Sequence, residues 1–279
     1  MDSLPTLTAS LKAHNLFAKK SFGQHFLLDQ NLTDKIARLA VPHEAVIEIG
    51  PGPGGLTRSL LNMGVKKLYA IEKDPRFISL LQEIENVSDG RLNVFEADAL
   101  KVDLAALDST RPLRVCANLP YNVGTKLLIN WLHAQPIFWD RLVLMLQKEV
   151  AMRIAAQPNT KPYGRLAVLA QSITAPHIAF EVPAHAFTPP PKVDSAVIVL
   201  DILPQGERYA DLKMLGRVTA SAFGQRRKML RKSLRALAGD LGIDLETWLG
   251  TANIDPSVRP ETIDIKGFHR LSDTANALR

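Results

Sequence analysis

The side chains of Asn118-Leu119-Pro120-Tyr121 are of the types that hold a planar base. They follow a short apolar run, residues 113–117, which predicts a buried strand. The Asn118 side-chain oxygen and a carbonyl beside Pro120 can each accept a hydrogen bond from an exocyclic amine. Pro120 keeps this backbone rigid because its ring fixes φ, and Tyr121 offers a face on which a base can stack. The same four residues also suit a plain turn at a strand end.

A glycine-rich segment, residues 50–55, connects an apolar run at 45–49 with a predicted helix. Glycine lets the backbone turn sharply and approach a ligand closely, and the helix N-terminus behind it favours negative groups. Glu72 ends the next predicted strand about 20 residues further on, where folds of this kind place an acid on ribose hydroxyls. Asp98 follows the third strand, and its carboxylate can accept from an adenine amine. These residues indicate a nucleotide-like cofactor.

The glycine spacing leaves a dinucleotide enzyme as an alternative, because Gly50, Gly52 and Gly55 have the spacing of a nicotinamide site. Asp98, however, suits an adenine ring better than a second nucleotide, and residues 118–121 supply no acid–base pair for hydride transfer. S-adenosylmethionine fits these residues, since its adenine and ribose need two acids and its methyl group must point at a target. The alternative is that Glu72 and Asp98 bind no ligand and lie in water at the end of a strand or cap a helix.

The elements that must position these residues alternate along the chain. Strands are predicted at 45–49, 67–72, 92–95, 113–117 and 141–146, and helices at 30–40, 56–63, 126–133 and 148–156. This alternation predicts an α/β fold with a parallel sheet and helices on both faces. Ligands of such sheets bind outside the carboxyl ends of the strands, so we expect one cleft there. Two later runs, 178–182 and 196–200, suit an antiparallel hairpin at the sheet edge.

Composition and charge narrow the class of protein. The chain has 279 residues, of which 46% are hydrophobic and 22% charged, as in ordinary globular proteins. Its net charge of +6 favours an anionic partner such as nucleic acid or a membrane surface. The single cysteine, Cys116, excludes an intramolecular disulfide and a multi-cysteine zinc site. Since no membrane-length apolar run and no secretory signal pattern is seen, we expect a cytoplasmic protein.

The pattern changes near residue 205, and from Leu212 onward it is helical only. We therefore expect a methyltransferase domain over 1–205, with an N-terminal RNA- and cofactor-binding segment at 1–44, and a small all-α domain over 206–279. Residues 212–239 contain eight basic residues and no acid. The residues expected to contact RNA phosphates are Arg226, Arg227, Lys228, Arg231 and Arg235. The plain alternative is a solvated charged helix.

The same region predicts an amphipathic helix. Its apolar stripe comprises Leu230, Leu234, Leu237 and Leu241. Arg227, Arg231 and Arg235 follow each other at a spacing of four, which places them on a neighbouring face of one helix. Lys12, Lys19 and Lys20 are expected to extend the same RNA-binding surface.

In their order along the chain these motifs resemble the ribosomal RNA adenine N6-dimethyltransferases. The resemblance spans nearly the whole sequence and also includes residues 19–29, 187–195 and 223–230. It implies a Rossmann-like S-adenosylmethionine methyltransferase sheet. Within the family the chain looks like the bacterial small-subunit branch, which dimethylates two adjacent adenines near the 3′ end of 16S rRNA. Relatives that confer macrolide resistance act on large-subunit rRNA and more often carry Ile where this chain has Leu119.

The resemblance also implies roles for individual residues. The residues that bind the cofactor would be His25, Leu27, Gly50, Gly52, Glu72, Asp98 and Asn118. The residues that contact the target base would be Asn118, Leu119, Pro120, Tyr121 and Phe187. Tyr121 would stack on one side of the base and Phe187 on the other. The family usually has Asn where His25 stands, so we expect a backbone contact there. Asn is also usual where Lys232 stands.

The expected reaction is a direct in-line methyl transfer that depends on positioning, without a covalent enzyme intermediate or a metal. The target adenine must leave its stack to be reached. We expect a monomer that acts on 16S rRNA in the small ribosomal subunit and has no membrane partner. The alternative from another class is a non-catalytic RNA-binding assembly factor that retains the methyltransferase fold.

Overall fold

The computed structural model describes residues 4–18, 23–225 and 227–279, which divide into two compact units. The first unit comprises Met1–Ala151 and His177–Ile202, and the second comprises Met152–Pro176 and Leu203–Arg279. The end of the first unit lies close to the predicted boundary at 205. Residues 152–176, which we expected in the first domain, group with the second unit instead, because the helix they contain packs on the helices that follow residue 205.

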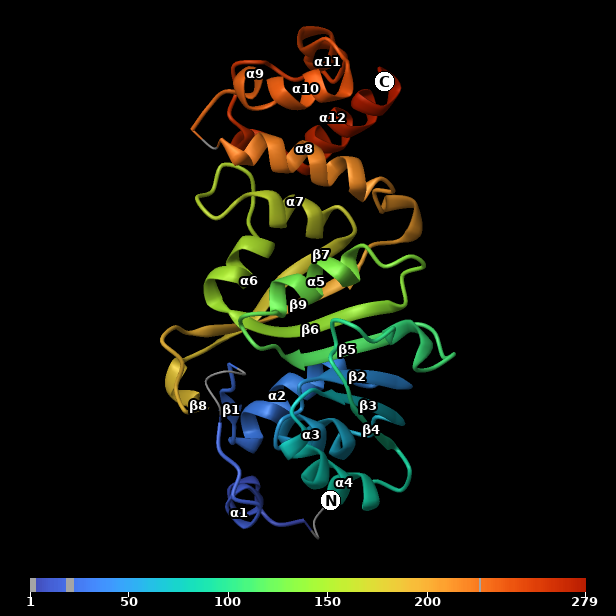
Figure 1. The fold of residues 1–279 in the computed structure, drawn as a ribbon, viewed down its shortest axis with the longest axis vertical. Helices are drawn as coiled ribbons and strands as arrows, with labels where there is room; N and C mark the ends of the chain where they lie inside the picture. Colours follow the sequence, from blue (N-terminus) through green and yellow to red (C-terminus); the bar gives the residue numbers. More distant parts are fainter. Residues whose placement is uncertain (1–3, 19–22, 226) are drawn as a thin grey trace. The chain divides into compact units, whose positions relative to one another are not determined.

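A seven-stranded sheet forms the centre of the first unit, with the strand order β4-β3-β2-β5-β6-β9-β7 (Figure 1). Its strands are β2 (Ala45–Ile49), β3 (Lys67–Glu72), β4 (Leu92–Glu96), β5 (Leu113–Asn118), β6 (Trp139–Gln147), β7 (Thr174–Val182) and β9 (Ser195–Ile202). The strands from β2 to β6 pair in parallel, and β9 pairs antiparallel with β6. The predicted parallel sheet is confirmed. β2 is buried along its whole length, as expected of a central strand covered on both faces.

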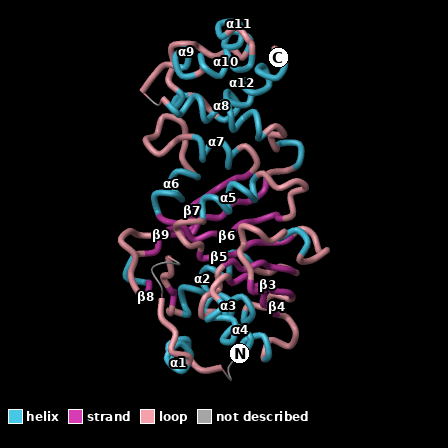
Figure 2. Tube along the Cα trace, viewed as in Figure 1, coloured by secondary structure: helices cyan, strands magenta, loops and turns pink. Residues whose placement is uncertain are grey.

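Helices lie in several of the connections that lead from one strand to the next (Figure 2). They include α2 (Gln30–Ala40), α3 (Gly55–Asn62), α4 (Ile78–Asn86), α5 (Gly124–Leu132) and α6 (Lys148–Ile154). The predicted helix at 30–40 is confirmed by α2, which begins where the Asp29 side chain accepts from the Asn31 amide. The amphipathic pattern of α2 buries Ile36, Ala37 and Ala40 in the core of the unit.

Several elements of the first unit have no counterpart among the predicted ones, and two of these involve the N-terminal segment. One is the N-terminal helix α1 (Leu7–Ala13). The other is a two-stranded sheet of β1 (Phe26–Leu27) and β8 (Phe187–Thr188), in which Leu27 lies opposite Phe187. The paired residues Leu27 and Phe187 lie 160 positions apart in the sequence, since 187 − 27 = 160. It therefore brings the N-terminal segment beside the Phe187 segment.

The second unit is helical and has its own core. Its helices are α7 (Arg165–Gln171), α8 (Leu212–Gly224), α9 (Leu230–Ser233), α10 (Arg235–Leu241), α11 (Leu245–Thr251) and α12 (Ile265–Ala277). Trp248 and Phe268 are completely buried in it, and the Trp248 indole donates to the Leu271 carbonyl over 2.8 Å. Along the described part of the chain no helix has both the length and the apolar character needed to cross a bilayer.

The leucine stripe of this unit is buried as predicted, but the single helix carrying it is not formed. The helix after α8 is divided, and α9 begins at Leu230. Its first amides donate outside the helix, from Leu230 to the Val258 carbonyl and from Arg231 to the Pro256 carbonyl. Such bonds satisfy the free amides of a helix start, so α9 begins here. Arg227 lies before α9 and Arg235 lies in α10. The predicted face of three arginines on one helix is therefore wrong.

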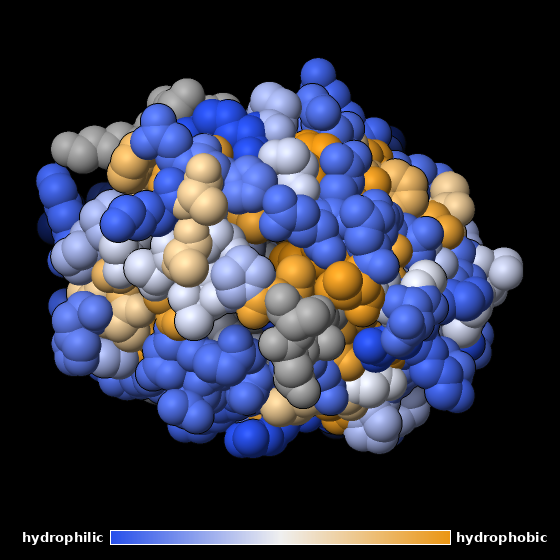
Figure 3. All heavy atoms as spheres, turned by 90° about the horizontal axis from the view of Figure 1, so that it is seen from below, coloured by the Kyte–Doolittle hydropathy of each residue, from blue (hydrophilic) through white to orange (hydrophobic). Residues whose placement is uncertain are grey.

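Most residues on the face of the molecule drawn in Figure 3 are hydrophilic, and the hydrophobic ones gather mainly near its middle. Among the described residues, Phe17 is the most exposed of the large hydrophobic side chains, at 67%. Isolated apolar side chains of this kind are common on protein surfaces.

Candidate cofactor and target-base site

A cleft of about 250 Å³ lies at the carboxyl ends of the parallel strands of the first unit. It is lined by all seven residues expected to contact a cofactor, namely His25, Leu27, Gly50, Gly52, Glu72, Asp98 and Asn118. Leu119, Pro120 and Tyr121 line it as well. Phe187 does not belong to this lining. The topology therefore brings the glycine turn, the two acids and the Asn-Leu-Pro-Tyr motif to one place.

Glu72 holds the glycine turn against the end of β3. Its two carboxylate oxygens accept from the Gly52 amide at 2.9 Å and from the Asp74 amide at 2.7 Å. Gly52 has a φ of +53°, and a Cβ there would lie 3.5 Å from the Phe26 ring. Burial raises the pKa of Glu72, although the two amides act in the opposite direction. Each oxygen still has a lone pair with which to accept a ligand hydroxyl.

Glu48 is a second buried acid of the cleft. Its side chain is almost fully buried and accepts from the Thr57 hydroxyl over 2.7 Å. Burial raises the pKa of Glu48 to about 8, and the charge of Glu72 adds to this effect. Glu48 is therefore largely protonated at neutral pH.

Asp98 pairs with Lys73, which is not among the predicted site residues. Its two oxygens accept from the Lys73 ammonium at 2.8 Å and from the Leu100 amide at 3.0 Å. The hydrogen bond from Lys73 lowers the pKa of Asp98, which keeps this carboxylate ionised. Lys73 also lines the cleft. Its position next to Glu72 is the sequence signal that points to it.

Asn118 ends β5, and its side-chain orientation is set by the N-terminal segment. Its Nδ2 donates to the His25 carbonyl over 3.2 Å. This bond leaves the side-chain oxygen as the group that can accept from a ligand amine. Pro120 then begins the turn into α5, and its carbonyl accepts from the amides of Val123 and Gly124.

Tyr121 is held by two contacts. Its hydroxyl makes a hydrogen bond of 2.6 Å with the Ser195 hydroxyl, and its ring stacks on His25 with 5.7 Å between the centroids. Phe187 lies behind His25, edge-on at 6.5 Å, and is only 2% exposed. In this conformation Phe187 is part of the hydrophobic core and offers no free face to a base. The role of Phe187 at the target base stays a prediction.

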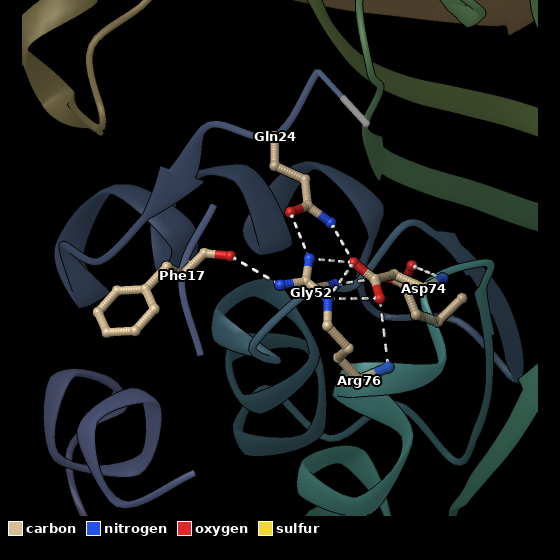
Figure 4. A network of polar contacts seen from close by, with 6 residues as sticks. Phe17, Gln24, Gly52, Asp74 and Arg76 are labelled. Carbon is tan, nitrogen blue, oxygen red and sulfur yellow. Dashed lines mark hydrogen bonds and ion pairs between the residues drawn. The ribbon is translucent and has the colours of Figure 1, made fainter. Parts of the chain in front are cut away.

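A polar network fastens the N-terminal segment beside the glycine turn (Figure 4). Arg76 pairs with Asp74 and donates to the Phe17 carbonyl at 3.1 Å, and Gln24 donates to Asp74 at 2.9 Å. Burial alone would raise the pKa of Asp74, but the hydrogen bonds from Arg76 and Gln24 lower it. Gln24 lines the cleft, so the network connects the cleft wall to the residue two positions after Glu72.

The basic residues expected to contact RNA lie in the second unit. Arg227, Lys228, Arg231 and Arg235 are exposed. Over the described ranges none of the four has an acid within ion-pair distance. Arg226 lies outside the described residues, as do Lys19 and Lys20.

Comparison with known families decides between the alternatives left open by the glycine turn. The family model described as "Ribosomal RNA adenine dimethylase" matches residues 15–274. The chain belongs to this family. Its membership confirms the resemblance that the motifs indicate and removes the nicotinamide alternative.

Curated dimethylase relatives match over nearly the full chain. One, named "Ribosomal RNA small subunit methyltransferase A" from Maricaulis maris, is 54% identical over 275 residues, covering 98% of this chain and 95% of the relative. A relative of the same name from Agrobacterium fabrum is 51% identical over 279 residues, covering 98% of each chain.

Two solved structures of RNA-modifying transferases share the fold. A dimethyladenosine transferase from Plasmodium falciparum has a TM-score of 0.74 at 25% identity, over 88% of this chain and 96% of that one. The 23S rRNA methyltransferase ErmE has a TM-score of 0.66 at 24% identity. This match covers 90% of this chain and 99% of that one. The predicted methyltransferase fold is confirmed.

Proposed function

We propose that this dimethylase uses S-adenosylmethionine to dimethylate the N6 amine of two adjacent adenines near the 3′ end of 16S rRNA in the small ribosomal subunit. The observation that carries the proposal is the meeting of Glu72 and Asp98 with Asn118 in one cleft. The two acids suit ribose and adenine, and the amide suits an exocyclic amine. The names of the relatives support the choice of the small subunit.

The residues of the cleft fit S-adenosylmethionine. Glu72 is buried with both oxygens held in place, so it can accept from ribose hydroxyls without reorganising. Gly52 leaves room beside Phe26 that a side chain would fill. Asp98 is ionised and can accept from the adenine amine. His25 and Leu27 would border the pocket through their backbone, and Gly50 would lie under the methionine portion.

The cofactor supplies an electrophilic methyl group bound to a sulfonium. The residues of the chain orient the amine that receives it. The Asn118 side-chain oxygen accepts one N–H of the adenine amine. The second acceptor is the Leu119 carbonyl, since that of Pro120 already accepts from Val123 and Gly124. Two acceptors turn the nitrogen lone pair out of the ring system and toward the methyl group, which is catalysis by positioning.

The target base must be flipped out of its stack to reach Asn118. Tyr121 supplies a face for it in the cleft. In the second unit, Arg227, Lys228, Arg231 and Arg235 contact rRNA phosphates, together with Arg226. Contacts of this type position an enzyme without reading sequence. One chain carries all residues of the cleft, so a monomer suffices, and we place it in the cytoplasm with its ribosomal substrate.

The experiment that tests the function is transfer of labelled methyl from S-adenosylmethionine to isolated ribosomal subunits that lack the modification. We expect label in small subunits, recovered as N6,N6-dimethyladenosine. Label only in large-subunit RNA would overturn the choice of substrate. Binding of the particle without transfer would favour a non-catalytic assembly factor. The Asn118→Ala variant serves as the negative control.

A further inference from the structure

We propose that His25 is a positioning residue for the target base, which rests on the proposed function. Its ring supports one face of Tyr121 and ties the β8 segment to the cleft, so that the flipped adenine stacks on the opposite face of Tyr121. The expectation from the sequence was different, because it gave His25 a backbone contact with the cofactor and no role for its ring.

His25 contacts three of the residues expected at the target base, namely Asn118, Tyr121 and Phe187. Its backbone carbonyl accepts from Asn118 Nδ2 at 3.2 Å. Its ring stacks on Tyr121 with an interplanar angle of 28° and meets Phe187 edge-on. Its Nδ1 lies 2.7 Å from the Pro189 carbonyl. His25 therefore contacts both Asn118, which is expected to hold the target amine, and Tyr121, which is expected to stack on the base.

The hydrogen bond to Pro189 requires a proton on Nδ1 of the imidazole. A carbonyl oxygen can only accept, so Nδ1 carries the proton and donates it. The ring therefore cannot flip without losing this bond. The same bond attaches the segment after β8 to the N-terminal segment, next to the pairing of β1 with β8.

The stacking geometry decides which surface is left for the base. Tyr121 is fixed at its hydroxyl by Ser195 and on one face by His25. A base that stacks on Tyr121 must use the other face, because the first is occupied. Phe187 lies behind His25 in the core, so His25 is the aromatic support that this site uses next to Tyr121.

Two variants separate the ring of His25 from its hydrogen bond. His25→Phe keeps an aromatic ring and loses the donor to Pro189, whereas His25→Asn keeps a side-chain donor and loses the ring. For each variant we would measure kcat and KM for methylation of small subunits and the Kd for S-adenosylmethionine. We would also measure nitration of Tyr121 by tetranitromethane in the free protein, resolved by peptide mass spectrometry. Tyr163, which is completely buried in the second unit, is the internal control.

We expect His25→Asn to lower kcat/KM for the subunit about three- to tenfold, the size of one aromatic pair, and to raise Tyr121 nitration severalfold. The Kd for the cofactor should stay within twofold and Tyr163 should react as before. His25→Phe should lose less kcat/KM than His25→Asn and leave Tyr121 less reactive, because it keeps the ring on Tyr121. The proposal is overturned if nitration of Tyr121 is unchanged in His25→Asn, if His25→Phe loses as much activity, or if cofactor affinity falls equally. If the wild type does not methylate small subunits but the nitration pattern is as expected, the proposed function fails while the support of Tyr121 by His25 stands.

Discussion

Asn118 is held by the N-terminal segment, since its Nδ2 is bound by the His25 carbonyl. This arrangement separates the two ends of one amide, with the nitrogen bound to the protein and the oxygen left to accept from a ligand. The motif Asn-Leu-Pro-Tyr predicts the acceptor, but the carbonyl that orients it comes from a residue 93 positions earlier. Sequence spacing alone cannot reveal such a contact.

Asn118→Ala removes the acceptor for the target amine, so methyl transfer should fall by about 10²–10³-fold, as for other single groups that stabilise a reacting centre. Cofactor affinity should change little, because Glu72 and Asp98 remain. Single-turnover transfer and binding calorimetry with S-adenosylmethionine measure the two effects. A parallel loss of cofactor affinity would contradict the role of Asn118.

Glu48 makes stability depend on pH. Its folded pKa of about 8 lies above the ordinary value of 4.5, so the folded state retains a proton that the unfolded chain releases. The contribution to stability is complete below pH 4.5 and is lost as pH rises toward 8.

Glu48→Gln removes this loss of stability. As pH rises from 5 to 8.5, the unfolding free energy of the variant should therefore increase relative to that of the wild type. The expected increase is at least roughly 1 kcal/mol, since one pKa unit corresponds to about 1.4 kcal/mol. Urea unfolding at the two pH values measures the gain. The exposed Glu44 is the matched control, and Glu44→Gln should stay within about 0.5 kcal/mol. An equal gain at both pH values would show that Glu48 is ionised.

At the scale of elements, two glycines with positive φ flank α3, Gly54 before it and Gly64 after it, and they are constrained in different ways. Gly54 has a φ of +83°, and a Cβ there would lie 2.3 Å from Ile84 Cδ1, in the packed core. Gly64 has a φ of +86° but nothing within 4 Å of an added Cβ. The pair therefore distinguishes backbone strain from a clash.

Gly64→Ala should cost about 1–2 kcal/mol of unfolding free energy, the usual penalty of the left-handed region. Gly54→Ala should cost a further 1–3 kcal/mol or so from overpacking. Chemical denaturation of both variants checks the difference. If the two variants were equally stable, α4 would not pack on the turn as described.

The strands could be predicted because each is a short apolar run bounded by turn residues, and β2 and β3 begin and end where the sequence indicates. The pairing of β1 with β8 could not, because two-residue strands carry no periodic signal and their pairing is purely tertiary. The same limit explains Phe187. Phe187 was expected to stack on the target base, whereas its burial comes from its pairing with β1 and its contact with His25.

At the scale of the whole molecule, the cleft and the exposed basic residues expected to contact RNA belong to different units. The cleft belongs entirely to the first unit, and the exposed cluster Arg227, Lys228, Arg231 and Arg235 belongs to the second. The excess of basic residues after Leu212 could be predicted from composition. The division of the helix could not, since it depends on the Pro256 and Val258 carbonyls, which lie 25 or more positions later in the chain.

Replacing Arg227, Arg231 and Arg235 together by Ala should weaken binding to small subunits and lower the slope of log K against log salt by about 2, because each phosphate contact adds 0.7–0.9. The matched control is the triple Lys variant, which keeps the charge and should keep the slope. Binding measured over a series of salt concentrations gives both slopes. An unchanged slope in the Ala variant would place the RNA surface elsewhere.

The most direct test of the central claim is mass spectrometry of the 3′-terminal nuclease fragment of 16S rRNA, after unmodified small subunits have reacted with the protein and S-adenosylmethionine. The account predicts four added methyl groups, two on each of two adjacent adenines, and none with Asn118→Ala. An unmodified fragment, or methyl groups on a base other than adenine, would contradict it.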